Sequence, residues 1–77
     1  MPHVILKIAA GKSDQEKQRL ADALATAVTS TLGYDKKLVS VGIEDVEVSD
    51  WAEKVYRPDI LEKADLIFKR PGYDPFA

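Results

Sequence analysis

The sequence predicts an α/β (α+β) fold built on a β-α-β unit, in which two parallel strands are joined by one long helix. Two short segments alternate apolar and polar residues, as strands do, and the segment between them repeats its leucines at helical spacing. A helix of this length serves as a right-handed crossover between parallel strands. No repeat or linker divides the 77 residues, so we expect a single domain over residues 1–77.

The first strand is expected at His3–Ala9, directly after Met1 and Pro2. Residues at every second position share one face of a strand. One face then carries three aliphatic side chains: Val4, Leu6 and Ile8. Gly11 and Lys12 form the turn that follows.

A long amphipathic helix is expected after this turn. Ser13 fits the N-cap, and Glu16 three residues later completes a capping box. Apolar side chains then recur at i, i+4 spacing, which is typical of a helix with one buried face. They are Leu20, Leu24, Val28 and Leu32. Gly33 is placed to end the helix in the left-handed conformation.

The second strand is expected where Val39, Val41 and Ile43 alternate with polar or small residues. The apolar residues that follow fall on even numbers. This change of phase indicates a bulge, or the end of the strand, near residues 44–45.

Two further helices are expected in the C-terminal part. Ser49 or Asp50 caps a short helix that carries Trp51, and Pro58 suits the first turn of another helix. The apolar stripe of this last helix consists of Ile60, Leu61, Ala64, Ile67 and Phe68. Residues 71–72 (Pro-Gly) stop it.

Composition excludes several classes of function. The net charge is -2, from 11 basic and 13 acidic residues that mix along the chain, so no basic stripe indicates nucleic-acid binding. With no cysteine and one histidine, neither a disulfide nor a structural zinc is expected. No apolar run has the length of a membrane span, and no signal peptide is recognisable. The expected location is cytoplasmic.

The small size of the chain predicts a homo-oligomer. A domain of this length buries only about 60% of its unfolded surface and is marginal alone. A two-stranded sheet with one helix leaves a sheet face without a partner. We therefore expect the sheet to be extended to four strands, or to a larger assembly, by a second copy of the chain.

Pro2 is the first candidate for chemistry. If Met1 is removed, the ring nitrogen of Pro2 becomes a free secondary amine in place of an amide. An α-amino group has a pKa of about 8, and burial or a nearby cation lowers it, which suits a general base near neutral pH. The alternative is that Pro2 only stiffens the start of the strand.

The order of these motifs resembles the 4-oxalocrotonate tautomerase family. The resemblance is carried by Pro2 before a strand, by Gly-Lys-Ser-Asp at residues 11–14, and by Ser-Val at residues 40–41. Residues 49–51 and 70–73 are similar to one branch, the small dimeric tautomerases active on phenylpyruvate-type enols.

The resemblance implies a cofactor-independent enol–keto isomerisation of a 2-oxo acid such as phenylenolpyruvate. Pro2 would take a proton from the enol hydroxyl, or from carbon, and return it to another carbon. Neither a cofactor nor a metal is implied. Family members assemble as dimers, trimers or hexamers, and the longer tail and the Trp51 segment favour a dimer over a hexamer.

The binding residues that the resemblance implies are Lys12 and Trp51. Lys12 stands where well-known members carry an arginine that binds a carboxylate, and Trp51 falls where the family has an aromatic wall. Gly42 replaces a second arginine, so a mono-acid with an apolar side fits better than a dicarboxylate. The alternatives are a solvated lysine, a packing tryptophan, and a glycine that permits close approach of another backbone. His3 is expected to be a structural or interface residue.

Two other functions remain open on the sequence. A protonated Pro2 would suit hydration or dehalogenation of small unsaturated acids, although this chemistry needs arginines that both expected positions lack. The chain would otherwise be a non-catalytic, oligomeric ligand-binding member of the same fold. Tyr34, Tyr56 and Tyr73 could each donate a hydrogen bond to a substrate, and their spacing selects none of them.

Overall fold

A computed structural model describes residues 1–77 as two compact units, Met1–Asp45 and Val46–Ala77. Each unit is described by itself below. The first contains the long helix, a short 3-10 turn and both strands except for the last residue of the second strand, and the second contains the remaining helical segments and the C-terminal tail.

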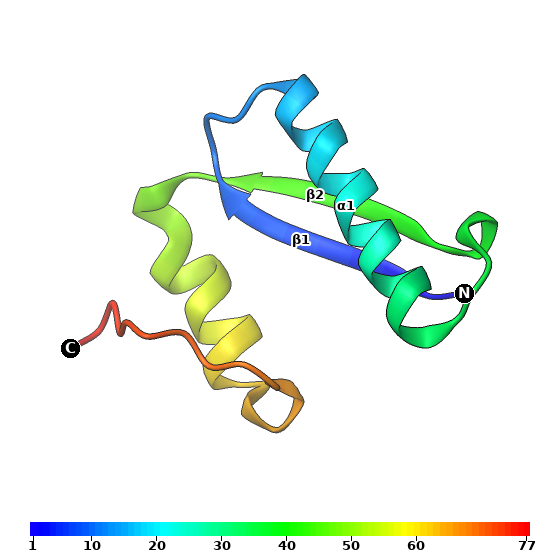
Figure 1. The fold of residues 1–77 in the computed structure, drawn as a ribbon. Helices are drawn as coiled ribbons and strands as arrows, with labels where there is room; N and C mark the ends of the chain where they lie inside the picture. Colours follow the sequence, from blue (N-terminus) through cyan, green and yellow to red (C-terminus); the bar gives the residue numbers. More distant parts are fainter. The chain divides into compact units, whose positions relative to one another are not determined.

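The first unit is the expected β-α-β unit. Strand β1 (His3–Ala9) leads into helix α1 (Asp14–Leu32), and a short 3-10 turn at Lys36–Leu38 precedes strand β2 (Ser40–Val46). β1 and β2 are neighbours in one parallel sheet, and both arrows point the same way in Figure 1. Helix α1 packs on one face of this sheet through its apolar side, where Ala25 is buried.

Both ends of α1 are formed by the residues that the sequence indicates. The backbone N–H of Glu16 donates to Ser13 Oγ over 3.1 Å, and the backbone N–H of Ser13 donates to Glu16 Oε1 over 3.2 Å. This reciprocal capping box satisfies two N–H groups that the first turn would leave unpaired. At the other end, Gly33 adopts φ 77° and donates its N–H to Thr29 O over 2.9 Å.

Strand β2 ends at Val46, one residue beyond the position where the sequence predicts a bulge or an end. Its final residues, Glu44 to Val46, belong to the strand. Glu44 pairs with Lys7 of β1 over 3.8 Å, and Asp45 pairs with Lys17 of α1. Asp45 therefore takes a position on the helix side that an apolar residue would otherwise fill, and its charge is compensated there. The alternation of the two strand faces therefore continues to Val46, with Asp45, paired with Lys17, in a position where an apolar residue was expected.

The predicted helix that begins at Pro58 is absent. Instead, Pro58 lies inside a single helix, η3 (Ala52–Leu61), and only a 3-10 turn (Ala64–Leu66) follows it. Helix η3 has the wider i→i+5 hydrogen bonds, such as Glu62 N–H to Arg57 O over 3.0 Å. Proline lacks an N–H and its ring displaces the carbonyl one turn earlier. The wider turn accommodates this loss, so Pro58 does not start a new helix.

The expected apolar stripe after Pro58 is also only partly formed. Phe68, which the stripe included, is 100% exposed, and Leu61 and Leu66 are exposed as well. Ile60 and Ile67 are half-buried. The stripe fails because the chain leaves the helix at Leu61, so the residues beyond it no longer share one helical face.

Aromatic residues hold the C-terminal tail onto η3 in the second unit. Tyr56 is buried, and its hydroxyl donates to Tyr73 O over 3.1 Å. Its ring also meets the rings of Tyr73 and Phe76 at centroid distances of 5.5 and 5.9 Å. The Arg57 guanidinium lies over the Phe76 ring at 4.4 Å. Burial, followed by the nearby Asp74 carboxylate, raises the pKa of the Tyr56 phenol.

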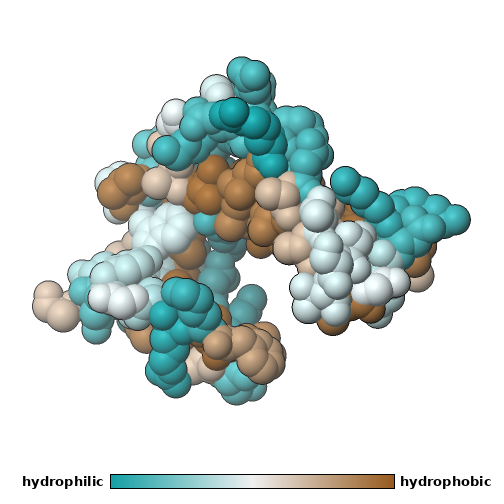
Figure 2. Space-filling view, viewed as in Figure 1, coloured by the Kyte–Doolittle hydropathy of each residue, from teal (hydrophilic) through white to brown (hydrophobic).

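The buried core of the chain is small. Only Ala25, Val55 and Tyr56 are buried, and no side chain is completely enclosed. Large apolar side chains reach the surface, as the brown atoms in Figure 2 illustrate. They include Ile5, Leu32, Leu38, Val48, Leu61, Leu66 and Phe68. No helix is long and apolar enough to cross a membrane.

Candidate functional site

Pro2 is fixed at the start of the sheet. It is half-buried, and its carbonyl accepts a hydrogen bond from the Ser40 N–H over 3.2 Å. This bond ties the residue before β1 to the first residue of β2. Met1, in contrast, is 85% exposed. The backbone of Pro2 is thus held in place by the sheet rather than by the residue that precedes it.

A second contact joins the strands beside Pro2. His3 Nδ1 lies 2.6 Å from Ser40 Oγ, so the two side chains are hydrogen-bonded across the sheet. Ser40 therefore engages Pro2 with its backbone and His3 with its side chain. Sequence reasoning did not select Ser40 for this role, because the register of the two strands is needed to pair it with the N-terminal residues.

Lys12 lies at the other end of β1, at the rim of a groove of about 440 Å³ between the end of the strand and the first turns of α1. The groove is lined by Ile8, Ala9, Lys12, Glu16, Lys17, Arg19 and Leu20. Its volume falls in the range of small-molecule sites, and apolar side chains with a few charged groups are typical of such sites.

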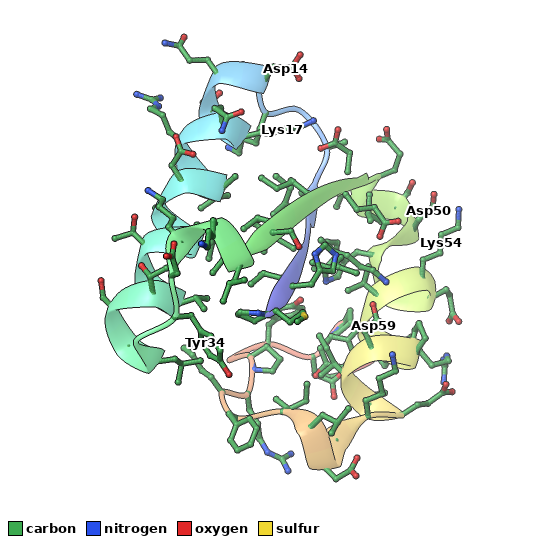
Figure 3. The ribbon with its side chains drawn as sticks, turned by 90° about the vertical axis from the view of Figure 1, so that its right-hand side faces the viewer. Asp14, Lys17, Tyr34, Asp50, Lys54 and Asp59 are labelled. Carbon is green, nitrogen blue, oxygen red and sulfur yellow. The ribbon has the colours of Figure 1, made fainter.

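Two of the charged groups in this groove are already engaged. The Glu16 carboxylate accepts from Ser13, and this hydrogen bond is the main reason that its pKa is lowered. The ammonium of Lys17, on the first turns of α1 in Figure 3, is hydrogen-bonded to Asp45, which raises the pKa of Lys17. Lys12 and Arg19 take part in no hydrogen bond or ion pair. Lys12 interacts with Glu16 through its charge alone, and Arg19 has no charged partner in the groove. The groove therefore offers two cations next to an apolar surface.

One chain does not bring Pro2 and Lys12 together. They stand beyond opposite ends of β1, which has seven residues. At about 3.3 Å per residue, the two ends of such a strand are roughly 20 Å apart. A small 2-oxo acid cannot span this distance. A site that uses both residues has to draw them from two chains.

Gly42 lies in the middle of β2. A Cβ built at this position would meet no atom within 4 Å, so no neighbour within the chain requires a glycine here. Gly42 also offers no side chain to a ligand, as the sequence indicates.

Trp51 belongs to the second unit, where it immediately precedes η3. It is half-buried, and its indole N–H donates to Tyr73 Oη over 2.7 Å. The tryptophan therefore has a fixed ring, and the Tyr73 hydroxyl keeps its own proton available for donation. The i, i+4 ion pair of Asp50 and Lys54, over 3.2 Å, joins the 3-10 turn Val48–Asp50 to η3 (Figure 3).

The sequence analysis does not single out Arg19, and it names Tyr73 only as one of three possible hydrogen-bond donors. Arg19 lines the same groove as Lys12, and Tyr73 is the acceptor for Trp51. Arg19 follows Glu16 at i+3, so helical spacing alone places both on one side of α1. Nothing in the local sequence links Tyr73 to Trp51, 22 positions earlier. No group of three or more histidine, aspartate or glutamate side chains is arranged to hold a metal ion.

Known proteins with a similar sequence are described as tautomerases. Residues 2–55 match the model of the family described as "Tautomerase enzyme". A probable tautomerase of Xylella fastidiosa is 49% identical over 77 residues, which is 100% of this chain and 94% of that protein. Tautomerase PptA of Cronobacter sakazakii is 31% identical over 75 residues, 96% of this chain and 99% of that protein.

Solved structures resemble the fold as well. TomN, a 4-oxalocrotonate tautomerase homologue of the tomaymycin biosynthetic pathway, superposes with a TM-score of 0.63 at 32% identity, over 65% of this chain and 77% of TomN. YwhB, another 4-oxalocrotonate tautomerase homologue, gives a TM-score of 0.58 at 30% identity, over 60% of this chain and 75% of YwhB. These similarities confirm the expected β-α-β class.

Proposed function

Because this chain belongs to the tautomerase family and is an isomerase, we propose that it interconverts the enol and keto forms of a 2-oxo acid with Pro2 as the general base. The observation that carries the proposal is the position of Pro2, which is held before β1 by the hydrogen bond from Ser40. Removal of the exposed Met1 turns its ring nitrogen into a secondary amine without disturbing this bond.

The reaction needs only a proton acceptor and a binding site. The enol hydroxyl gives its proton to the Pro2 nitrogen, and the C2–O bond becomes a carbonyl as the electrons of the C2–C3 double bond take up a proton at C3. The resulting prolinium ion supplies that proton, so the enzyme returns to its starting state. No electrons are gained or lost overall, and the residues present suffice for this chemistry.

We propose that Lys12 of a second copy of the chain completes the site. The separation of Pro2 and Lys12 along β1 supports this, since the two residues of one chain cannot hold the same small acid. The small core and the exposed apolar side chains support association with another copy. Oligomers are typical of this family, and the dimer is the proposed state.

The apolar part of the site favours a substrate with an aromatic or aliphatic side group. Leu20 and Ile8 line the groove at Lys12, and Gly42 provides no second cation. Trp51 is proposed as a further apolar wall, and its fixed ring supports this role. A phenylenolpyruvate-like mono-acid meets these requirements better than a dicarboxylate.

The experiment is a ketonisation assay on protein whose intact mass shows that Met1 is absent. The Met1-free chain should convert phenylenolpyruvate to phenylpyruvate, and Pro2→Ala should lower kcat by about 10²- to 10⁴-fold, the usual contribution of a general base. Circular dichroism of the variant should match the parent. If P2A is as active as the parent, Pro2 is not the base.

Two controls separate this proposal from its alternatives. A form that retains Met1 should be inactive, because an amide nitrogen is not basic. The rate should fall on acidification, as a base requires, whereas an acid role in hydration or dehalogenation would make it fall on alkalinisation. A Met1-free chain that binds the enol but does not convert it would instead be a non-catalytic ligand-binding member of the fold.

A further inference from the structure

The chain lacks an arginine at both positions where the family resemblance places one. Lys12 retains a positive charge but not the planar fork that binds a carboxylate through two parallel N–H groups, and Gly42 retains neither. A substrate carboxylate held by one flexible ammonium would be poorly oriented. A second cation close to Lys12 would solve this problem.

Arg19 lines the same groove as Lys12 and can be this second cation. It lies on α1 and lines the groove with Lys12, Ile8 and Leu20. Arg19 and Leu20 follow Glu16 at i+3 and i+4, and all three residues line the groove, so α1 presents this side of its first turns to the groove. The guanidinium thus shares a binding surface with the Lys12 ammonium.

The charges around Arg19 leave its guanidinium available. Glu16 is the only carboxylate that lines the groove, and the capping box at Ser13 already engages it. Lys17 is neutralised by Asp45. Arg19 therefore has no charged partner in the groove, and Lys12 interacts only through its charge with Glu16. An anion that enters this groove meets both of them.

We propose that Arg19 binds the carboxylate of the apolar 2-oxo acid, with Lys12 as a second contact, and so takes the part of the fork arginine that the chain lacks. The ligand class is a monocarboxylate whose apolar side group lies along Ile8 and Leu20. The role in turnover rests on the proposed tautomerase function, while the binding of the carboxylate does not.

The kinetic test compares Arg19→Gln and Arg19→Lys with Lys37→Gln. The last variant removes one positive charge from the same unit, at a side chain outside the groove. We expect R19Q to raise KM for phenylenolpyruvate about tenfold, the effect of losing one charge-assisted hydrogen bond. The value of kcat should stay within about twofold, because the carboxylate is held equally in substrate and transition state. R19K should lie between the two, and K37Q should match the parent.

A binding test works without turnover. 3-Phenylpropanoate and its neutral amide are titrated against ¹⁵N-labelled P2A, with and without R19Q, and amide shifts are followed by NMR. P2A should bind the acid more tightly than the amide. R19Q should lose most of this preference and keep its affinity for the amide, which a general structural defect would not do.

The two proposals fail in different ways. If P2A is fully active but R19Q abolishes the preference for the acid, the base assignment is wrong and the carboxylate site stands. If R19Q binds the acid as the parent does and leaves KM unchanged, Arg19 has no part in binding, whatever the role of Pro2. Equal loss of acid and amide binding in R19Q would also overturn the inference.

Discussion

At the residue scale, the proposed chemistry depends on the state of one nitrogen. An α-amino group with a pKa of about 8 is mostly protonated at neutral pH, so a useful base needs a lower value. An apolar pocket lowers the pKa by disfavouring the charged form, and nearby cations act in the same direction. Lys12 and Arg19 from a second copy would supply such cations. The residues that bind the carboxylate would therefore also tune the base.

Tyr73→Phe tests the contact that fixes Trp51. Because the chain has one tryptophan, its fluorescence reports this site alone. Loss of the Tyr73 hydroxyl leaves the indole N–H without its acceptor, so we expect a shifted emission maximum and a loss of about 0.5–1.5 kcal/mol in the free energy of unfolding.

The matched control for this variant is Tyr34→Phe, since Tyr34 is exposed and its hydroxyl makes no hydrogen bond. It should leave both emission and stability unchanged. Identical spectra of Y73F and the parent would show that the Trp51–Tyr73 bond does not persist in solution.

At the element scale, the sequence is most informative where a local signal and the packing agree. The capping box, the leucine spacing and Gly33 specify α1 from end to end, and the structure confirms the helix and both of its ends. The leucine face is buried only in part, because Leu20 and Leu32 are exposed. The expectation at Pro58 is wrong because the turns of η3 are wider than those of an α-helix, and a helix of this kind accommodates a proline in its interior. The sequence does not point to Arg19, because the groove that Arg19 lines forms only when β1 and α1 pack together.

Ser13→Ala should destabilise the first unit by about 1 kcal/mol, the usual effect of removing an N-cap side chain. The Glu16 N–H loses its acceptor while the rest of α1 is unchanged. Urea unfolding followed by circular dichroism measures the difference. Ser30→Ala, at an exposed position near the other end of α1, should have little effect.

The capping box also predicts that the free energy of unfolding depends on pH. The pKa of Glu16 is lowered below its ordinary value of 4.5 by its hydrogen bond with Ser13. A lowered folded-state pKa means that its contribution to stability is complete above about 4.5 and is lost as the pH falls through the folded value. Between pH 6 and pH 3, Glu16→Gln should show a smaller loss of stability than the parent. Parallel curves for both proteins would contradict this.

At the scale of the whole molecule, a small core and a divided site point to the same requirement. A core of three buried residues is too small to stabilise a single chain well. Pro2 and Lys12 of one chain also lie too far apart to contact the same small ligand. Association of two copies would answer both needs. Sequence length and composition predict this association, but the partner surface depends on contacts that a single chain does not contain.

Stability should therefore depend on protein concentration. Binding to a second copy stabilises the folded form by mass action, so Tm should rise as the concentration is raised from micromolar to hundreds of micromolar. As one domain, residues 1–77 should unfold in a single transition. A Tm that is independent of concentration, together with a monomeric mass in solution, would contradict the proposed dimer.

Mixing two impaired variants tests the divided site. Pro2→Ala removes the base of every site and Lys12→Ala removes a carboxylate contact of every site, so each homodimer should be much less active than the parent when the substrate concentration is well below KM. After unfolding and refolding together, mixed dimers hold one intact site, with Pro2 from one chain and Lys12 from the other. Random mixing should restore about a quarter of the parent activity. If mixing restores none, both residues act within one chain.

The most direct measurement of the central claim is an NMR titration of ¹⁵N-labelled Pro2 in the Met1-free protein. The account predicts a single titration of the ring nitrogen below the ordinary amine value of about 8, so that the amine is largely uncharged at neutral pH. The pKa of the acidic limb of the rate profile should coincide with it. A nitrogen that stays protonated well above pH 8, while the enzyme is active at neutral pH, would contradict the account.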